Sequence, residues 1–145
     1  MTDPLIRPAT TADAPALTAC FSAAYAPWRA RLPDLPDVSG GLDDDIRDHM
    51  VFVAEDDSGL LAGIVLVQRG DVLHVANLAV HPQASGRGLA RRLMDAAEAQ
   101  ARASGCHRMY LATHRDMPGN VALYRHLGWR VVETGPRKVT MEKGL

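Results

Sequence analysis

The stretch from residue 80 to residue 93, VHPQASGRGLARRL, most constrains how this chain can fold. It leaves an apolar, β-rich run at Val80 and enters a segment of helical spacing near Gly88. Glycine is a poor residue for beginning a helix, because ordering its backbone costs the most entropy. The two glycines are therefore expected to serve a strand-to-helix turn. Since a helix N-terminus presents unpaired N–H groups and a partial positive charge, this turn is a candidate phosphate site; a tight turn without a ligand is the alternative.

The rest of the chain alternates between the periods of strands and helices. Strands are expected at 5–10, 51–55, 60–68, 72–80, 108–113, 129–134 and 138–143. A first helix is expected after the candidate N-caps Thr10, Thr11 and Asp13, further helices at 88–104 and 120–127, and a short helical turn in 42–49. The first long helix is expected to end before Pro27, and the last to begin with Asn120 as its N-cap. This order predicts an α/β (or α+β) chain with a single mixed, mostly antiparallel sheet of about seven strands and helices on both faces.

Composition narrows the function classes. The chain has 145 residues, enough for one domain over 1–145, and a formal net charge of −1, so no basic field favours nucleic acid. No apolar run reaches the roughly 20 residues that span a membrane. The first residues do not resemble a secretory signal, and Cys20 and Cys106 are the only cysteines. A cytoplasmic protein with reduced thiols and no metal site is expected, since the histidines and cysteines lack ligand spacing.

Several segments together resemble one family. QASGRG, residues 83–88, is similar to the Q/R-x-x-G-x-G/A motif of the GCN5-related N-acetyltransferases (GNAT). NLAVHP before it, the amphipathic helix after it and GNVALYRHLGWRVVE downstream follow that family's order and spacing. LIRPATTADAPAL resembles its first strand and helix, and the resemblance is weakest from Pro27 to His49. It implies the GNAT fold and an enzyme that uses acetyl-CoA.

The resemblance implies how the cofactor would be held. Backbone N–H groups after Gln83 would face the pyrophosphate, at Ser85, Gly86, Arg87, Gly88, Leu89 and Ala90. The preceding strand is bulged in the family, and backbone groups of Leu78, Ala79 and Val80 would pair with the pantetheine arm. In relatives, the asparagine equivalent to Asn120 can also contact the cofactor. Ser85 departs from the Arg or Gln that relatives often carry, which puts one side-chain contact in doubt. Arg87, Arg91 and Arg92 would add charge near the phosphates, or else form a solvated helix face.

Acyl transfer to an amine needs a neutral amine, donors for an oxyanion and a proton for the departing thiolate. Tyr124 stands at the position of the family's usual thiolate acid; an aromatic residue packed on the sheet is the alternative. Some relatives carry a glutamate base where this chain has His74, whose imidazole also suits a base. A half-buried strand histidine is the alternative there. Neither cysteine is well placed for a covalent intermediate.

The acceptor side is expected in the irregular region after the first helix. Tyr25, Trp28 and Arg29 would wall a pocket, with residues 113–120 closing over it, and the run LDDDIRD would attract a cationic amine or form an acidic surface. The expected function is direct acetyl transfer to a primary amine of a small molecule. A protein or peptide acceptor is one alternative, although Ala112 stands where ribosomal-protein acetyltransferases often carry a glutamate. A non-catalytic acyl-CoA-binding module is another, and a homodimer stays open.

Overall fold

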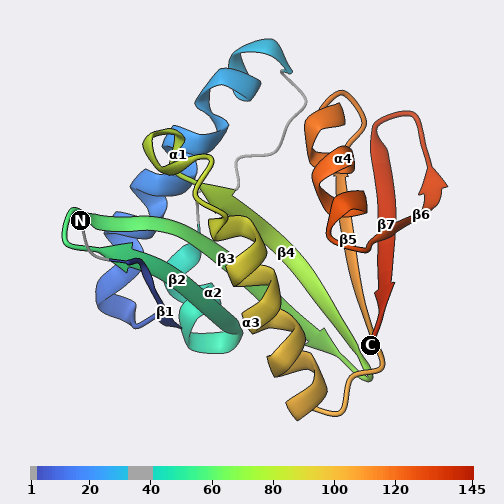
Figure 1. The fold of residues 1–145 in the computed structure, drawn as a ribbon, viewed down its shortest axis with the longest axis horizontal. Helices are drawn as coiled ribbons and strands as arrows, with labels where there is room; N and C mark the ends of the chain where they lie inside the picture. Colours follow the sequence, from blue (N-terminus) through green and yellow to red (C-terminus); the bar gives the residue numbers. More distant parts are fainter. Residues whose placement is uncertain (1–2, 33–40) are drawn as a thin grey trace.

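The computed structural model describes residues 3–32 and 41–145, and its centre is one seven-stranded sheet (Figure 1). The strand order is β1-β2-β3-β4-β5-β7-β6, antiparallel except where β4 meets β5. The strands are β1 (Leu5–Pro8), β2 (Met50–Asp56), β3 (Gly59–Arg69), β4 (Val72–Val80), β5 (Arg108–His114), β6 (Arg130–Thr134) and β7 (Lys138–Gly144). Each lies within two residues of its expected bounds, so the predicted mixed, mostly antiparallel sheet is confirmed.

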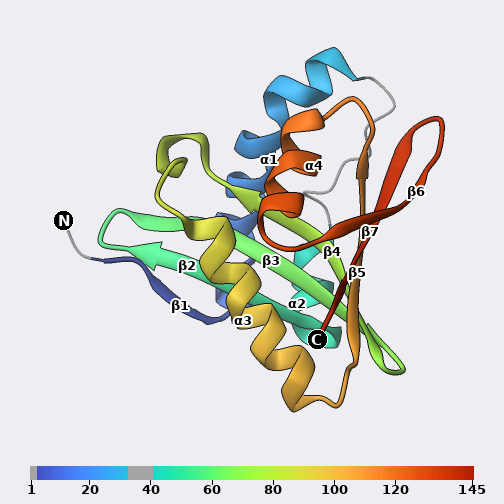
Figure 2. The same cartoon turned by 45° about the vertical axis from the view of Figure 1, so that its right-hand side comes forward.

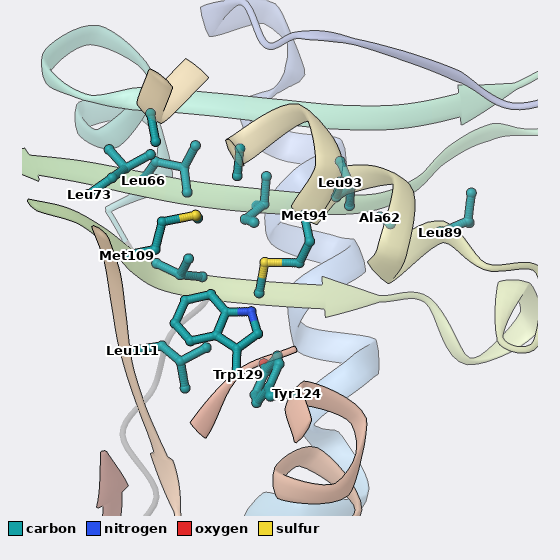
Figure 3. Close-up of a cluster of buried hydrophobic side chains, with 14 of the residues drawn as sticks. Ala62, Leu66, Leu73, Leu89, Leu93, Met94, Met109, Leu111, Tyr124 and Trp129 are labelled. Carbon is teal, nitrogen blue, oxygen red and sulfur yellow. The ribbon is translucent and has the colours of Figure 1, made fainter. Parts of the chain in front are cut away.

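Helices cover both faces of this sheet, as expected (Figures 1 and 2). They are α1 (Ala14–Arg31), α2 (Leu42–Asp48), α3 (Leu89–Ala103) and α4 (Pro118–His126). One buried cluster joins α1 and α2 to the sheet, and a larger one joins α3 to it. Figure 3 shows that this second cluster extends to Tyr124 of α4 and to Trp129. No helix in residues 3–32 and 41–145 is both long and apolar enough to span a membrane.

The apolar stripes predicted from spacing are the buried faces of the two long helices. In α3, Leu89, Leu93, Ala97 and Ala101 are all at most 2% exposed. In α1, Leu17, Cys20 and Phe21 are equally buried. The residues of β3 from 61 to 66 are buried on both sides of the sheet, because α1 packs on one face and α3 on the other. This central position explains why that strand reads as a continuous apolar run.

Two helix boundaries differ from the sequence prediction. Helix α1 does not end before Pro27 but continues to Arg31. A proline inside a helix removes one hydrogen bond, here that to the Ala23 carbonyl, and its ring crowds that carbonyl. The helix nevertheless continues beyond it, and Leu32 N–H closes the final turn on Trp28 O at 2.7 Å. Helix α4 begins at Pro118, with Met117 as its N-cap, so Asn120 lies inside the first turn. The fixed φ of proline suits this first helical position, where its missing N–H has no intrahelical partner to lose.

Gly63 allows α1 to approach β3 closely. A Cβ at this position would lie 2.4 Å from Leu17 Cδ1 and 3.2 Å from Phe21 Cε1. We expect Gly63→Ala to lower the free energy of unfolding by about 1–3 kcal/mol, because the core must shift to admit one methyl group. Denaturant unfolding measures this loss. Gly119→Ala is the control, since its Cβ would meet nothing within 4 Å; equal stability of the Gly63 variant and the wild type would show that the contact relaxes freely.

Candidate active site

Strands β4 and β5 separate along their length and open the sheet. They pair in parallel only over Val72–His74 and Arg108–Tyr110. On the other side of β4, Val65 of β3 pairs with Asn77 and Leu66 with Val75, so Ala76 is an extra residue in a β-bulge. Bulges bend a strand and increase its twist. Figures 1 and 2 show β4 and β5 meeting at one end and diverging towards α1 and α4. The bulge expected on this strand is present, just before Leu78.

The glycine-rich junction follows the free end of β4. Pro82–Ala84 form a single 3₁₀ turn, in which the Gln83 N–H donates to His81 Nδ1 at 3.1 Å and the Ser85 hydroxyl to Pro82 O at 2.8 Å. Gly86 and Gly88 then adopt φ of 80° and 73°, values that residues with a Cβ rarely take. Both side-chain positions are open, with nothing within 4 Å of a built Cβ. The glycines are therefore required by backbone conformation, and they leave open space at the helix start.

The beginning of α3 presents backbone N–H groups that have no acceptor within the helix. The first bond of its ladder runs from Arg92 N–H to Gly88 O at 3.1 Å, so the N–H groups of residues 89–91 precede the ladder. Aligned peptide dipoles give this end a partial positive charge. The predicted contacts from Ser85 to Ala90 thus lie together on one short segment, with Ser85, Gly86 and Gly88 exposed. Backbone donors, positive potential and open space make this segment a suitable site for phosphate groups.

Arg87 attaches this segment to the sheet. Its guanidinium lies 3.4 Å from Asp56 Oδ2, at the end of β2. Hydrogen bonds from Ser58, followed by that of Arg87, hold the pKa of Asp56 below its usual value, so the carboxylate stays charged at neutral pH. Arg91 and Arg92 are exposed on α3. Arg87 therefore already forms an ion pair with Asp56 within the protein, in addition to any contact with a phosphate.

Two pockets lie along the part of β4 that is not paired with β5. The junction-side pocket, about 200 Å³, reaches the start of α3 and is lined by Ala24, Tyr25, Trp28, Leu78, Ala79, Val80, Ala90, Met117, Asn120, Leu123 and Tyr124. The strand-side pocket, about 400 Å³, is lined by Tyr25, Val75, Ala76, Asn77, Leu78, Leu111, Ala112, Thr113, His114, Met117, Asn120, Tyr124, Arg137 and Lys138. Tyr25, Leu78, Met117, Asn120 and Tyr124 line both. The two pockets therefore meet at these shared residues.

Tyr124 is at this meeting point and is held firmly. It is 7% exposed, and its ring lies 6.2 Å from that of Trp129, centre to centre (Figure 3). The backbone N–H of Trp129 also donates to the backbone carbonyl of Tyr124 at 2.9 Å, in the turn that Gly128 makes at the end of α4. Burial, with a smaller contribution from Tyr25, raises the pKa of the Tyr124 hydroxyl well above its usual value. Like that of an unperturbed tyrosine, the hydroxyl is therefore protonated at neutral pH and has a proton to donate.

Tyr25 brings a second hydroxyl to the same place. It donates to Asn77 Oδ1 at 2.9 Å and approaches Leu78 O at 3.5 Å, next to the bulge. Burial raises the pKa of Tyr25 to about 12. Of the residues predicted to wall an acceptor pocket, Tyr25 lines both pockets and Trp28 the junction-side one, whereas Arg29 lines neither.

His74 is not brought together with the other predicted site residues. It lies where β4 and β5 are still paired, and its ring is 4.7 Å from that of Tyr110. Desolvation, with Arg69 and Arg108 nearby, lowers the pKa of its imidazole. It lines neither pocket. This arrangement favours the interpretation of His74 as a packed strand residue.

The remaining sequence candidates lie away from the pockets. The aspartates of LDDDIRD are on α2, where Asp43 and Asp44 pair with Arg47 of the same helix. Both cysteines are buried outside the pockets, and burial raises the pKa of Cys20 to about 11, so that thiol is un-ionised. Within residues 3–32 and 41–145, no three potential ligands gather as a metal site.

Sequence reasoning missed the contribution of the β6–β7 hairpin. Arg137 and Lys138 line the strand-side pocket, from a turn that contained no motif. Met117 was also missed, although it lies inside the stretch 113–120 that was expected to close over the acceptor side. Thr113, His114, Met117 and Asn120 do line that pocket.

Comparison with known proteins agrees with this geometry. Glucosamine 6-phosphate N-acetyltransferase 1 of Oryza sativa subsp. japonica is 38% identical over 81 residues, covering 50% of this chain and 49% of that enzyme. The chain thus matches about half of the length of this curated relative. PaiA N-acetyltransferase from Thermoplasma acidophilum, solved with coenzyme A, superimposes with a TM-score of 0.89 and 19% identity over 99% of this chain and 100% of that chain.

Further solved structures share the architecture. The ribosomal-protein-S18-alanine N-acetyltransferase from Escherichia coli gives a TM-score of 0.81 with 18% identity, over 97% of this chain and 93% of that chain. At such identity the likeness concerns the fold. The sequence itself matches the acetyltransferase (GNAT) family over residues 17–129, most of the chain. The resemblance seen in the motifs is therefore confirmed, and the chain belongs to the acetyltransferase (GNAT) family.

Proposed function

We propose that this protein transfers an acetyl group from acetyl-CoA to a primary amine of a small molecule, by direct attack. One observation carries the proposal: an exposed glycine-rich helix start leads into a pocket that meets a second pocket at a buried, protonated tyrosine, Tyr124. Donor and acceptor would enter from opposite sides and meet there.

The residues of the junction fit coenzyme A. The open Cβ positions of Gly86 and Gly88 leave room for phosphates against the backbone, and N–H groups at the start of α3 supply donors. Leu78, Ala79 and Val80 line the pocket between this start and Tyr124, as a pantetheine arm requires. When bound, acetyl-CoA supplies an acetyl group activated as a thioester. The relatives named with coenzyme A or as N-acetyltransferases support the same donor.

The chain's own groups support direct attack. Tyr124 holds a proton at its hydroxyl and can deliver it to a departing thiolate. Tyr25 donates to Asn77 and fixes the bulged part of β4 beside Leu78. Neither cysteine lines a pocket, so no thiol is in place to carry the acetyl group in an intermediate step.

A small acceptor fits the size of the strand-side pocket, about 400 Å³. A peptide acceptor is the alternative, since one structural neighbour acts on a ribosomal protein. Incubation with acetyl-CoA and a panel of small amines and peptides, with CoA release and product mass as readouts, tests the proposal. Acetylated small amines are expected. Acetylated peptides alone would reassign the acceptor, and tight acetyl-CoA binding without any product would indicate a non-catalytic module.

His74 was predicted as a base, and its surroundings suggest a different role. We expect His74→Gln to leave the pH dependence of kcat/KM unchanged, because the ring packs on Tyr110 outside both pockets. A histidine acting as a base works only above its pKa, so the wild-type rate would fall on the acid side and the variant would lose that limb. Initial rates across the pH range measure this. Disappearance of the acid limb in the variant would restore the assignment of His74 as the base.

A further inference from the structure

We propose that Lys143 of β7 is a positioning residue for Tyr124: its ammonium holds the last turn of α4 against Glu98 of α3 and so fixes where the tyrosine hydroxyl lies. The proposal rests on the proposed function, because it gives Lys143 a part in the step for which Tyr124 supplies the proton. It follows from the place of Tyr124 near the end of α4, from two contacts of the ammonium, and from the space that Gly128 leaves for the lysine.

Tyr124 lies in the last turn of a short helix. Helix α4 has nine residues, and a helix of this length depends on contacts outside itself. The Tyr124 carbonyl accepts from the backbone N–H of Leu127 at 3.0 Å and from that of Trp129 at 2.9 Å, so a change in the path of this turn displaces the tyrosine. At the other end of the helix, Asn120 Nδ2 donates to Thr113 Oγ1 at 3.3 Å, which attaches α4 to β5.

Lys143 attaches the end of α4. Its Nζ donates to the carbonyl oxygen of Leu127 at 2.7 Å. The last carbonyls of a helix have no partner within the helix and carry partial negative charge, so an ammonium is favourable there. Leu127 is thus bonded on both sides, with its N–H to Tyr124 and its carbonyl to Lys143. One residue separates the lysine from the tyrosine in this chain of hydrogen bonds.

The same ammonium forms an ion pair with α3. Lys143 Nζ lies 3.1 Å from Glu98 Oε1, and the two side chains are 23% and 13% exposed. Arg102 also approaches this oxygen, at 3.8 Å, but its side chain is 59% exposed. Partial burial reduces screening by solvent, so the lysine pair is stronger than an ion pair at the surface. Helix α3 begins at the glycine-rich junction, so this contact connects the helix of the candidate phosphate site with the helix that carries Tyr124.

Gly128 leaves room for the lysine side chain. It follows the end of α4 with φ of 96°, and a Cβ there would lie 3.2 Å from Lys143 Cε and 3.4 Å from Nζ. Since side chains alternate along a strand, Lys143 shares a face of β7 with Met141, which is fully buried in the cluster that contains Tyr124 and Trp129 (Figure 3). The ammonium is therefore surrounded by groups of α3 and of the end of α4.

A positioning contact differs from a merely stabilising one in its dependence on Tyr124. Lys143→Met removes the ammonium and keeps an unbranched side chain. Arg7→Met is the matched control, because Arg7 lies 2.8 Å from Asp13 Oδ2 with side chains 27% and 14% exposed, and lines neither pocket. Each substitution is made in the wild type and in Tyr124→Phe. Rates are measured where circular dichroism shows every variant folded, per CoA site counted by calorimetry.

We expect Lys143→Met to lower kcat about tenfold to a hundredfold, because a misplacement of about 1 Å caused by a distant change can cost about a hundredfold. The affinity for acetyl-CoA should change little, because the start of α3 is unaltered. In the Tyr124→Phe background the same substitution should lower kcat less than about threefold, since residues that act as a unit are not additive. Arg7→Met should leave kcat within about twofold in both backgrounds, because distant sites act independently.

The same rates contain the results that would contradict the proposal. An unchanged kcat in Lys143→Met, or an equal loss in the Tyr124→Phe background, would overturn this inference and leave the proposed function intact. An unchanged kcat in Tyr124→Phe alone would overturn it as well, because there would be no acid to position.

Absence of turnover is separated by a measurement that needs no chemistry. If the wild type acetylates no amine, the proposed function falls, and NMR of ring-labelled tyrosine in the same variants reports the surroundings of Tyr124. The chain has three tyrosines, so Tyr124→Phe identifies its signal by loss. A Tyr124 signal that moves in Lys143→Met and not in Arg7→Met supports the hold of the lysine on the tyrosine. A signal that stays in place overturns this inference too.

Discussion

Gly86→Val is expected to lower the affinity for acetyl-CoA roughly a hundredfold or more. The φ of 80° at Gly86 is unfavourable for any residue with a Cβ, by about 1–3 kcal/mol, and most of all for a β-branched one. The valine side chain would also project into the open space beside the N–H groups of α3. Each phosphate hydrogen bond that this displaces contributes about 1.5–3 kcal/mol. Calorimetric titration with acetyl-CoA measures the change.

A matched variant separates loss of the site from loss of stability. Gly70, in the turn between β3 and β4, has φ of 64° and equally open surroundings, but lies outside both pockets. Gly70→Val should therefore carry a similar backbone strain and bind acetyl-CoA normally. Wild-type affinity in Gly86→Val would refute the phosphate site at the junction, whatever its effect on stability.

Tyr124→Phe should lower kcat by about a hundredfold to ten-thousandfold, the usual contribution of a positioned acid. Its affinity for acetyl-CoA should change little, because the phenylalanine ring keeps the contact with Trp129 and the walls of both pockets. Since its hydroxyl pKa is raised by burial, the wild-type tyrosine remains protonated through the neutral range, so the loss should appear at every pH near neutrality. Steady-state rates together with calorimetry distinguish the two effects.

The chain's three tyrosines make a complete series for this test. Tyr110→Phe removes the hydroxyl of a ring that packs on His74 and lines neither pocket, and should leave kcat unchanged. Tyr25→Phe removes the hydrogen bond to Asn77 and should have an intermediate effect. An unchanged kcat in Tyr124→Phe would remove it as the acid, and the largest loss in Tyr25→Phe would move the role to that residue.

Local patterns in the sequence predicted most of the fold. The strand bounds and the stripes of α1 and α3 follow from periods that each segment contains by itself. The two differences have local causes too: Pro27 sits within a helix that tolerates one missing bond, and Pro118 rather than Asn120 begins α4. Pro27 does disfavour a helix, but the remaining hydrogen bonds of α1 outweigh this effect. Asn120 does favour a helix N-terminus, but Pro118, two residues earlier, begins α4 instead.

A candidate site is easier to predict from sequence where contiguous backbone forms it than where side chains from distant segments converge. The junction from Gln83 to Ala90 is contiguous, so its motif predicts by itself which residues lie together, and their contact with the cofactor stays a prediction. His74 was proposed by counting along β4, but it lies in the still-paired part of the strand, before the bulge at Ala76. Arg137 and Lys138 reach the pocket through the pairing of β5 with β7, between residues far apart in sequence. No periodicity reports such a contact.

Initial rates measured while acetyl-CoA and a small amine that the enzyme acetylates are both varied test the central claim most directly. Direct attack at the meeting point of the two pockets requires both substrates to be bound at once. Reciprocal plots of rate against one substrate should therefore give lines that intersect as the other is varied. Parallel lines would indicate that the enzyme is acetylated first, and would contradict direct transfer beside Tyr124.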